Sequence, residues 1–174
     1  MPTKGIDFSK LSLMDALDLA VLIEEEARDR YLEFAEQMEA FHTPAAGAFF
    51  RKMVKVEEMH RAELATRRKS LFGEAPSRVS GTMIFDVEAP EYDQVRASMT
   101  PFQALQAALV SETKAHDFFA QAIPTVKDPE VKKLFEELRD EETEHQGWVK
   151  REMALKPDVP DVPGDVEDEP NAED

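Results

Sequence analysis

Apolar residues recur at helical spacing along four long stretches of the chain. These stretches cover approximately residues 12–41, 44–71, 100–123 and 129–155. Ser12 can cap the start of the first, with Asp15 three residues later. A polar residue followed by proline stands at the start of each of the other three, and proline is favoured at the first position of a helix. The pattern therefore predicts four long helices.

The connections between these helices predict how they are arranged. Short breaks separate the first helix from the second and the third from the fourth, which is typical of antiparallel helix hairpins. Residues 72–99 show no clear helical period, and a connection this long fits a crossover along the length of a bundle. Met83, Ile84, Phe85 and Val87 are candidates to attach the crossover to the helices. We expect an all-α, four-helix bundle made of two antiparallel hairpins.

The two predicted hairpins resemble each other in sequence. An Ala-Leu pair ends seven residues before Glu24 in the first helix and before Glu112 in the third. In the second and fourth helices, an apolar pair ends seven residues before Glu57 and Glu142. Each of these glutamates stands where the helical stripe would otherwise be apolar. The match indicates an internal duplication in which all four glutamates face the core.

Two Glu-x-x-His motifs, Glu57/His60 and Glu142/His145, lie in the second helix of each predicted hairpin. Residues three apart share one face of a helix, and in both motifs that face is otherwise apolar. With their partners in the first helices, four glutamates then point into one core. Buried carboxylates are costly unless cations or hydrogen bonds compensate them. Two divalent ions would balance the four negative charges, and the histidines would add neutral nitrogen ligands.

This combination is the ligand arrangement of di-iron and di-manganese carboxylate proteins, in which two helices give one glutamate each and two give Glu-x-x-His. Oxygen-rich ligation with one imidazole per metal favours iron or manganese over a closed zinc site. A single motif would carry little weight in a chain with 37 acidic residues, whereas two at matched positions carry more. We expect two iron ions, with manganese as the alternative. The six predicted ligands are Glu24, Glu57, His60, Glu112, Glu142 and His145.

Further residues near these positions bear on the site. The repeat selects Glu24 from three consecutive glutamates and leaves Glu25 and Glu26 facing solvent. Tyr31 lies two turns later, where it is either a plain core residue or a hydrogen-bond donor to a ligand carboxylate. His116 lies four residues after the glutamate of the third helix. It is either a further metal ligand or a residue that supports the site or faces outward.

Composition and charge restrict the class of protein. A chain of 174 residues suits one domain with one core. Its formal charge of -16 argues against a nucleic-acid partner, which would need a basic surface. The lack of cysteine excludes disulfides, thiolate zinc sites and iron–sulfur centres. The start has no apolar run long enough for a signal peptide or membrane span, so we expect a cytoplasmic protein with no membrane partner.

The end of the chain differs in composition from the rest. Residues 157–174 contain eight acidic residues and four prolines but no lysine or arginine. Prolines and like charges both oppose helix formation and compaction. We therefore expect a short lead-in over residues 1–11, the bundle over 12–155, and a disordered, acidic and proline-rich tail over 156–174.

Over residues 12–155 the chain resembles the rubrerythrin branch of the ferritin-like superfamily. The matching stretches are Glu24-Glu25-Glu26-Ala27-Arg28-Asp29-Arg30-Tyr31, Glu57-Glu58-Met59-His60, Ser111-Glu112 and Glu142-Thr143-Glu144-His145. The resemblance implies that the six predicted ligands hold a di-iron centre. The cysteines of a rubredoxin domain are absent, so the resemblance implies a separate electron-donor protein. Ala115 replaces an additional family glutamate, so the site also resembles the symmetric six-ligand ferroxidase centres of bacterioferritins.

By resemblance, the expected function is that of a non-haem di-iron oxidoreductase in a homodimer or larger homo-oligomer. Its oxidant is hydrogen peroxide or dioxygen. Peroxide reduction follows from the likeness to rubrerythrin, and ferrous-iron oxidation follows from Ala115 in place of the extra glutamate. The alternatives are a ferritin-like protein for iron binding, storage or delivery, and a di-iron hydroxylase with an apolar pocket beside the metals. A metal-free structural bundle is the remaining alternative.

Overall fold

The computed structural model describes residues 6–40, 44–83, 87 and 99–155, and this part of the chain contains four long helices. They are α1 (Leu13–Ala40), α2 (Pro44–Phe72), α3 (Pro101–Ala122) and α4 (Pro129–Leu155). Two short 3-10 helices, η1 (Phe8–Lys10) and η2 (Gly81–Met83), precede α1 and follow α2. The predicted helices agree closely with these bounds. The predicted acidic tail lies outside the described residues, as does the start of the lead-in.

Local hydrogen bonds explain where several helices begin and end. The hydroxyl of Ser12 donates to Oδ2 of Asp15 at 2.6 Å and accepts from the backbone N–H of Asp15 at 3.2 Å. Thr100 and Gln103 exchange side-chain and backbone bonds of 3.2 and 2.9 Å, so α3 begins with a capping box. Helix α2 ends at Phe72, and the next residue, Gly73, adopts a φ of 59°, a conformation that glycine takes without steric cost.

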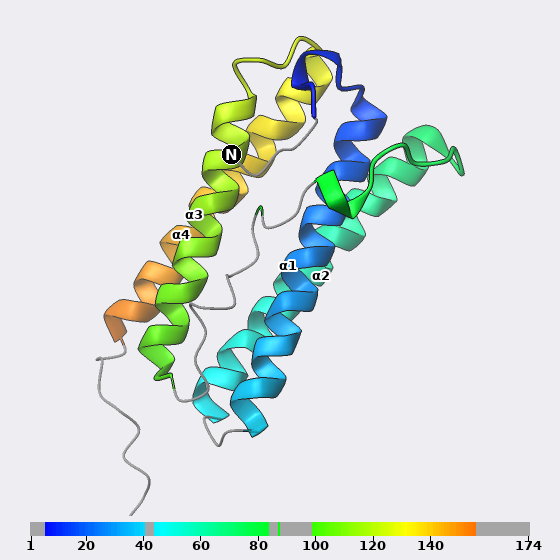
Figure 1. Ribbon diagram of the computed structural model, residues 1–174. Helices are drawn as coiled ribbons and strands as arrows, with labels where there is room; N and C mark the ends of the chain where they lie inside the picture. The colour runs from blue at the N-terminus through cyan, green and yellow to red at the C-terminus, as the bar shows by residue number, and fades with distance from the viewer. Residues whose placement is uncertain (1–5, 41–43, 84–86, 88–98, 156–174) are drawn as a thin grey trace, which may run out of the picture.

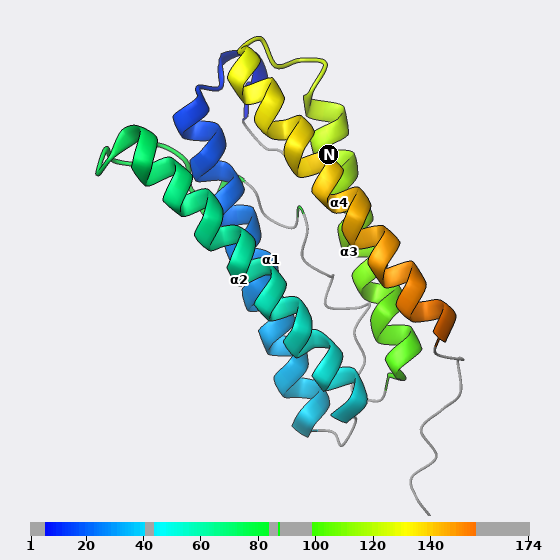
Figure 2. The same ribbon diagram turned by 180° about the vertical axis from the view of Figure 1, so that it is seen from behind.

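The helices form two antiparallel hairpins, α1 with α2 and α3 with α4, which lie side by side (Figure 1). Seen from behind, α2 and α4 form the nearer layer and α1 and α3 the farther one (Figure 2). Helix α2 ends at the opposite end of the bundle from the start of α3, as expected of two hairpins joined by a crossover (Figure 1). In it Val87 is buried and Met83 half-buried, whereas Ile84 and Phe85 lie outside the described residues. The predicted ferritin-like bundle is confirmed.

The core consists of two apolar clusters with a polar layer between them. The cluster near the α3–α4 turn draws on all four helices and includes Leu17, Ile23, Leu64, Phe119 and Phe135. The cluster near the start of α3 also draws on all four helices and includes Phe34, Met38, Phe50, Leu105 and Val149. In every helix one buried glutamate lies between the segments that contribute to the two clusters. These glutamates are Glu24, Glu57, Glu112 and Glu142.

Candidate metal centre

The polar layer contains all six predicted ligands, and they differ in exposure. The four glutamates retain no more than 2% of their exposed surface. The side chains of His60 and His145, from α2 and α4, keep 14% and 15%. The helical spacing of each Glu-x-x-His motif therefore places its two side chains in one layer, as expected. The carboxylates form the enclosed side of the site, and the histidines form its more open side.

Two groups of potential ligand atoms share Glu57. One group contains Glu24, Glu57 and His60, and the other contains Glu57, Glu112 and His145. Within each group the ligand atoms lie within 4.8 Å of one another. Nδ1 of His60 is 4.0 Å from Oε2 of Glu24, and Nδ1 of His145 is 3.0 Å from Oε2 of Glu112. This arrangement fits two metal ions with the carboxylate of Glu57 between them.

Glu142 lies beside the second of these groups. Its Oε2 is 3.6 Å from Nδ1 of His145. The negative charges of Glu112 and Glu24 both act on Glu142. It therefore lies near the two carboxylates that the groups do not share. Glu142 is the counterpart of Glu57 in the repeat, and its position fits a second carboxylate between two metals.

The protein alone does not compensate the negative charge that the enclosed carboxylates would carry when ionised. Among the described residues, none donates a hydrogen bond to Oε2 of Glu24 or to Oε2 of Glu142. Burial raises the pKa of Glu24 to about 7. Burial, followed by the charges of Glu112 and Glu24, holds the pKa of Glu142 well above its usual range. Divalent cations in this layer would compensate the carboxylates and allow them to ionise, so the residues present fit a metal pair.

The two histidines lie against each other at the open side of the site. Their rings stack almost in parallel, with centroids 4.9 Å apart and an interplanar angle of 5°. Burial, followed by the charge of His145, lowers the pKa of His60. Neutral imidazole keeps a lone pair on one ring nitrogen, and this is the form that binds metals. The site therefore disfavours the imidazolium form of His60, which would compete with a cation.

Tyr31 directly contacts the polar layer of the six predicted ligands, which is called the metal layer from here on. It is fully buried, and its hydroxyl donates to Oε1 of Glu112 at 3.2 Å. Of the two roles that the sequence left open for Tyr31, the structure shows the contact with a ligand carboxylate. Its ring also stacks on Phe50, with centroids 6.0 Å apart, so it belongs to the apolar core as well.

His116 and Ala115 lie next to each other in α3 but differ in their surroundings. Nδ1 of His116 is 3.0 Å from Oδ1 of the adjacent Asp117, and His116 belongs to neither ligand group. Ala115 is fully buried in the helix interface. The structure thus brings six of the seven candidate ligands together.

The expectation that Glu26 faces solvent is wrong. Its side chain is 19% exposed and lies 3.8 Å from Arg30, which is itself 8% exposed. The two residues are one helical turn apart and cover each other, which the repeat could not show. Glu25 is 46% exposed, in agreement with the expectation.

An ion-pair network beside the site was not identified from the sequence. Glu58 accepts hydrogen bonds from Arg28 of α1 at 2.8 Å and from Arg61 of α2 at 2.7 Å. The bonds from Arg61 and then Arg28 lower the pKa of Glu58 to about 2. Because Glu58 follows Glu57 directly, this network fixes α2 against α1 at the level of the ligands. The spacing of Arg61 three residues after Glu58 was the available signal.

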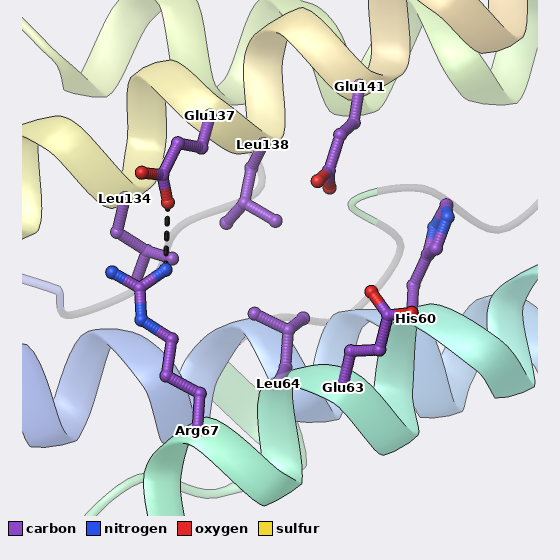
Figure 3. Close-up of a pocket in the computed structure, with 8 residues that line it drawn as sticks. All are labelled: His60, Glu63, Leu64, Arg67, Leu134, Glu137, Leu138 and Glu141. Carbon is purple, nitrogen blue, oxygen red and sulfur yellow. Dashed lines mark hydrogen bonds and ion pairs between the residues drawn. The ribbon is translucent and has the colours of Figure 1, made fainter. Parts of the chain in front are cut away.

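A cavity of about 160 Å³ lies against His60 between α2 and α4 (Figure 3). Its other lining residues include Glu63, Leu64, Arg67, Glu137, Leu138 and Glu141. This cavity was not predicted from the sequence. The sequence showed only that Glu63 stands three residues after His60 and that Glu141 directly precedes Glu142.

The comparisons with known proteins agree with this geometry. A family model described as Rubrerythrin matches residues 15–153. The solved structures include an uncharacterized conserved protein from Magnetospirillum magnetotacticum MS-1, with a TM-score of 0.66 and 28% identity, covering 87% of this chain and 99% of that one. No curated protein matches significantly. No described helix has the length and apolar character required to cross a membrane. The chain belongs to the rubrerythrin family.

Proposed function

We propose that the protein is a non-haem di-iron oxidoreductase that reduces hydrogen peroxide, oxidises ferrous iron, or does both. The observation that carries this proposal is the sharing of Glu57 between two buried ligand groups, each with its own histidine. Shared ligation supports two metals acting as one centre rather than two separate sites. Membership of the rubrerythrin family supports a redox role.

Two bound iron ions would supply the electrons that reduce the oxidant. Glu24 and His60 would hold one ion, and Glu112 and His145 would hold the other. Glu57 would bridge them, with Glu142 as the second bridging carboxylate. The four carboxylates together neutralise a pair of divalent ions.

The residues around the ligands fix their geometry and control access. The hydroxyl of Tyr31 holds one oxygen of Glu112 in place. The apolar clusters on both sides exclude water from the carboxylates. The half-buried face of His60 and His145 is then the side from which an oxidant can approach.

The choice of metal and partners follows from the ligand chemistry. Oxygen-rich donors with one imidazole per ion favour iron, with manganese next. The chain contains no cysteine, so we propose a separate electron-donor protein. The cavity against His60 is lined by three glutamates and an arginine, which does not favour an apolar organic substrate and thus a hydroxylase.

An anaerobic titration of metal-free protein with ferrous iron tests the first part of the proposal. The expected stoichiometry is two ions per chain. The ferrous protein is then mixed with hydrogen peroxide or with dioxygen in a stopped-flow instrument, and the absorbance of ferric iron is followed. Faster oxidation by peroxide indicates a peroxidase, and faster oxidation by dioxygen indicates a ferroxidase. The absence of an absorbance change with both oxidants would contradict either activity.

A further inference from the structure

The metal layer is closed on its carboxylate side and open on its histidine side. The four glutamates are almost completely buried between the two apolar clusters. His60 is several times more exposed than the glutamates and also lines the cavity between α2 and α4. On the inner side of His60, Oε2 of Glu24 is buried and accepts no hydrogen bond from the described residues. His60 therefore stands between the cavity, which it lines, and this carboxylate oxygen, which lies 4.0 Å from its Nδ1.

The charged residues of this cavity are distributed unevenly along it. At the end far from His60, Arg67 and Glu137 form an ion pair at 2.8 Å. Nearer to His60, Glu63 and Glu141 extend into the opening from opposite helices, and no hydrogen bond or ion pair joins them to the other residues drawn (Figure 3). Leu64 and Leu138 form the apolar floor. The cavity thus has one neutralised end and one negative end, and the negative end adjoins the metal layer.

We propose that divalent cations reach the metal layer through this cavity, with Glu63 and Glu141 as transient ligands on the way to His60. This inference rests on the proposed di-metal site but not on the redox reaction. Two carboxylates over an apolar floor concentrate negative potential, because the low-dielectric wall focuses the field. A cation held there needs only to pass the half-buried histidine edge to reach Glu24.

The ion pair of Arg67 with Glu137 makes the far end of the cavity less attractive to a cation than the end near His60. An arginine facing the metal layer would repel an incoming cation, and its pairing with Glu137 neutralises it at the far end. A cation in the cavity is therefore attracted toward the end at which Glu63, Glu141 and His60 meet.

Cobalt(II) uptake by the metal-free, full-length protein tests the route without using the redox reaction. Cobalt gains visible absorbance on binding nitrogen and oxygen ligands, so its binding rate can be followed anaerobically by stopped flow. The test variant is Glu63→Gln/Glu141→Gln. The matched control is Glu36→Gln/Glu130→Gln, which removes the same charge from exposed residues of α1 and α4 that do not line the cavity.

We expect the cavity variant to bind cobalt about tenfold more slowly than wild type at low salt, because electrostatic focusing raises association rates by at least this factor. The control is expected to keep nearly the wild-type rate, and all three proteins to bind two ions. Raising the salt concentration should narrow the difference, since screening weakens the attraction. A second variant, Glu141→Lys, should bind still more slowly, because its ammonium group can pair with Glu63 across the opening.

The possible outcomes separate the route from the proposed reaction. Equal rates in the cavity variant and the control overturn the route. Cobalt uptake that depends on the cavity, in a protein that reacts with neither oxidant, supports the route and contradicts the proposed reaction. A wild-type protein that binds no cobalt contradicts both.

Discussion

The hydroxyl of Tyr31 in α1 lies 3.2 Å from Oε1 of Glu112 in α3. This hydrogen bond joins the two hairpins inside the metal layer. The other oxygen of Glu112 is 3.0 Å from Nδ1 of His145. Both oxygens of this carboxylate are therefore oriented by protein groups in the described structure, whereas Oε2 of its counterpart Glu24 accepts no hydrogen bond from the described residues. The two halves of the site are similar in ligands but differ in how firmly the protein holds them.

Replacing Tyr31 with phenylalanine should weaken the binding of one metal ion more than that of the other. The ring packing against Phe50 is kept, and only the hydroxyl is lost. We expect the affinity at Glu112 and His145 to fall by about tenfold or more, as for other groups that orient a metal ligand. An equilibrium cobalt titration should then resolve two steps. An equal loss of affinity in both steps would argue against a specific role for the hydroxyl.

Substitutions of Glu57 and of His60 should differ in how many metal ions per chain the protein retains. Glu57 belongs to both ligand groups, whereas His60 belongs to one. We expect Glu57→Ala to abolish tight binding of both ions and His60→Ala to leave one. Metal analysis after removal of loosely bound ions distinguishes the two results. A Glu57→Ala protein that retains two ions would show that Glu57 does not bridge them.

The metal-free protein should lose stability as the pH rises from about 5 to about 8, because Glu24 then loses its proton. Its pKa is raised from 4.5 to about 7 in the folded protein, so the folded state binds the proton more tightly than the unfolded chain. This contribution to stability is full below the unfolded pKa and is lost as the pH rises through the folded pKa. Thermal unfolding with a chelator present, recorded across this range, measures the effect.

The matched control for this pH dependence is Glu24→Gln. His60 acts with the opposite sign, because its pKa is lowered in the folded protein and its contribution is lost as the pH falls. The comparison with Glu24→Gln, which keeps His60, separates the two. The wild-type melting temperature should fall more steeply with pH than that of the variant. Parallel curves would show that Glu24 does not titrate in this range.

Gly47 should be required for the close packing of α1 against α2. A Cβ atom at this position would lie 3.1 Å from Cγ of Glu39 and 3.3 Å from the backbone oxygen of Ala35. Forcing extra volume into such a contact costs about 1–3 kcal/mol, which exceeds the helix preference of alanine over glycine of about 1 kcal/mol. We therefore expect Gly47→Ala to lower the free energy of unfolding, measured in urea.

Gly147 provides the matched control in α4. A Cβ atom there would meet only the flexible end of Arg151, at 3.4 Å. Gly147→Ala should therefore raise the free energy of unfolding by about 1 kcal/mol through helix preference alone. Equal stabilisation by both substitutions would contradict the packing argument for Gly47.

Local sequence features were sufficient to predict the helices and most of the ligand layer. Capping residues and prolines mark helix starts because they act within one turn, as Ser12 and Thr100 do. The Glu-x-x-His spacing also acts within one helix, so it places Glu57 and His60 in one layer. The repeat then identified Glu24 as the inward residue among three adjacent glutamates, and the structure buries it.

Features that depend on the separation between helices could not be predicted from the sequence. The sharing of Glu57 by two groups depends on how far α3 lies from α1, which no spacing within one helix encodes. The cavity at Glu63 and Glu141 depends on the packing of α2 against α4. The partial burial of Glu26 was mispredicted because the internal repeat does not report the contact with Arg30, one helical turn later in the same helix.

The placement of an apolar cluster on each side of the metal layer determines how the protein and its metals depend on each other. Each cluster ties all four helices together without using a ligand. The folded state thus has a source of cohesion that is independent of metal, unlike small domains that fold only around a bound ion. The metal-free protein should therefore stay folded and able to bind metal again, and loss of metal should stop the proposed reaction well before it exposes the chain to proteases.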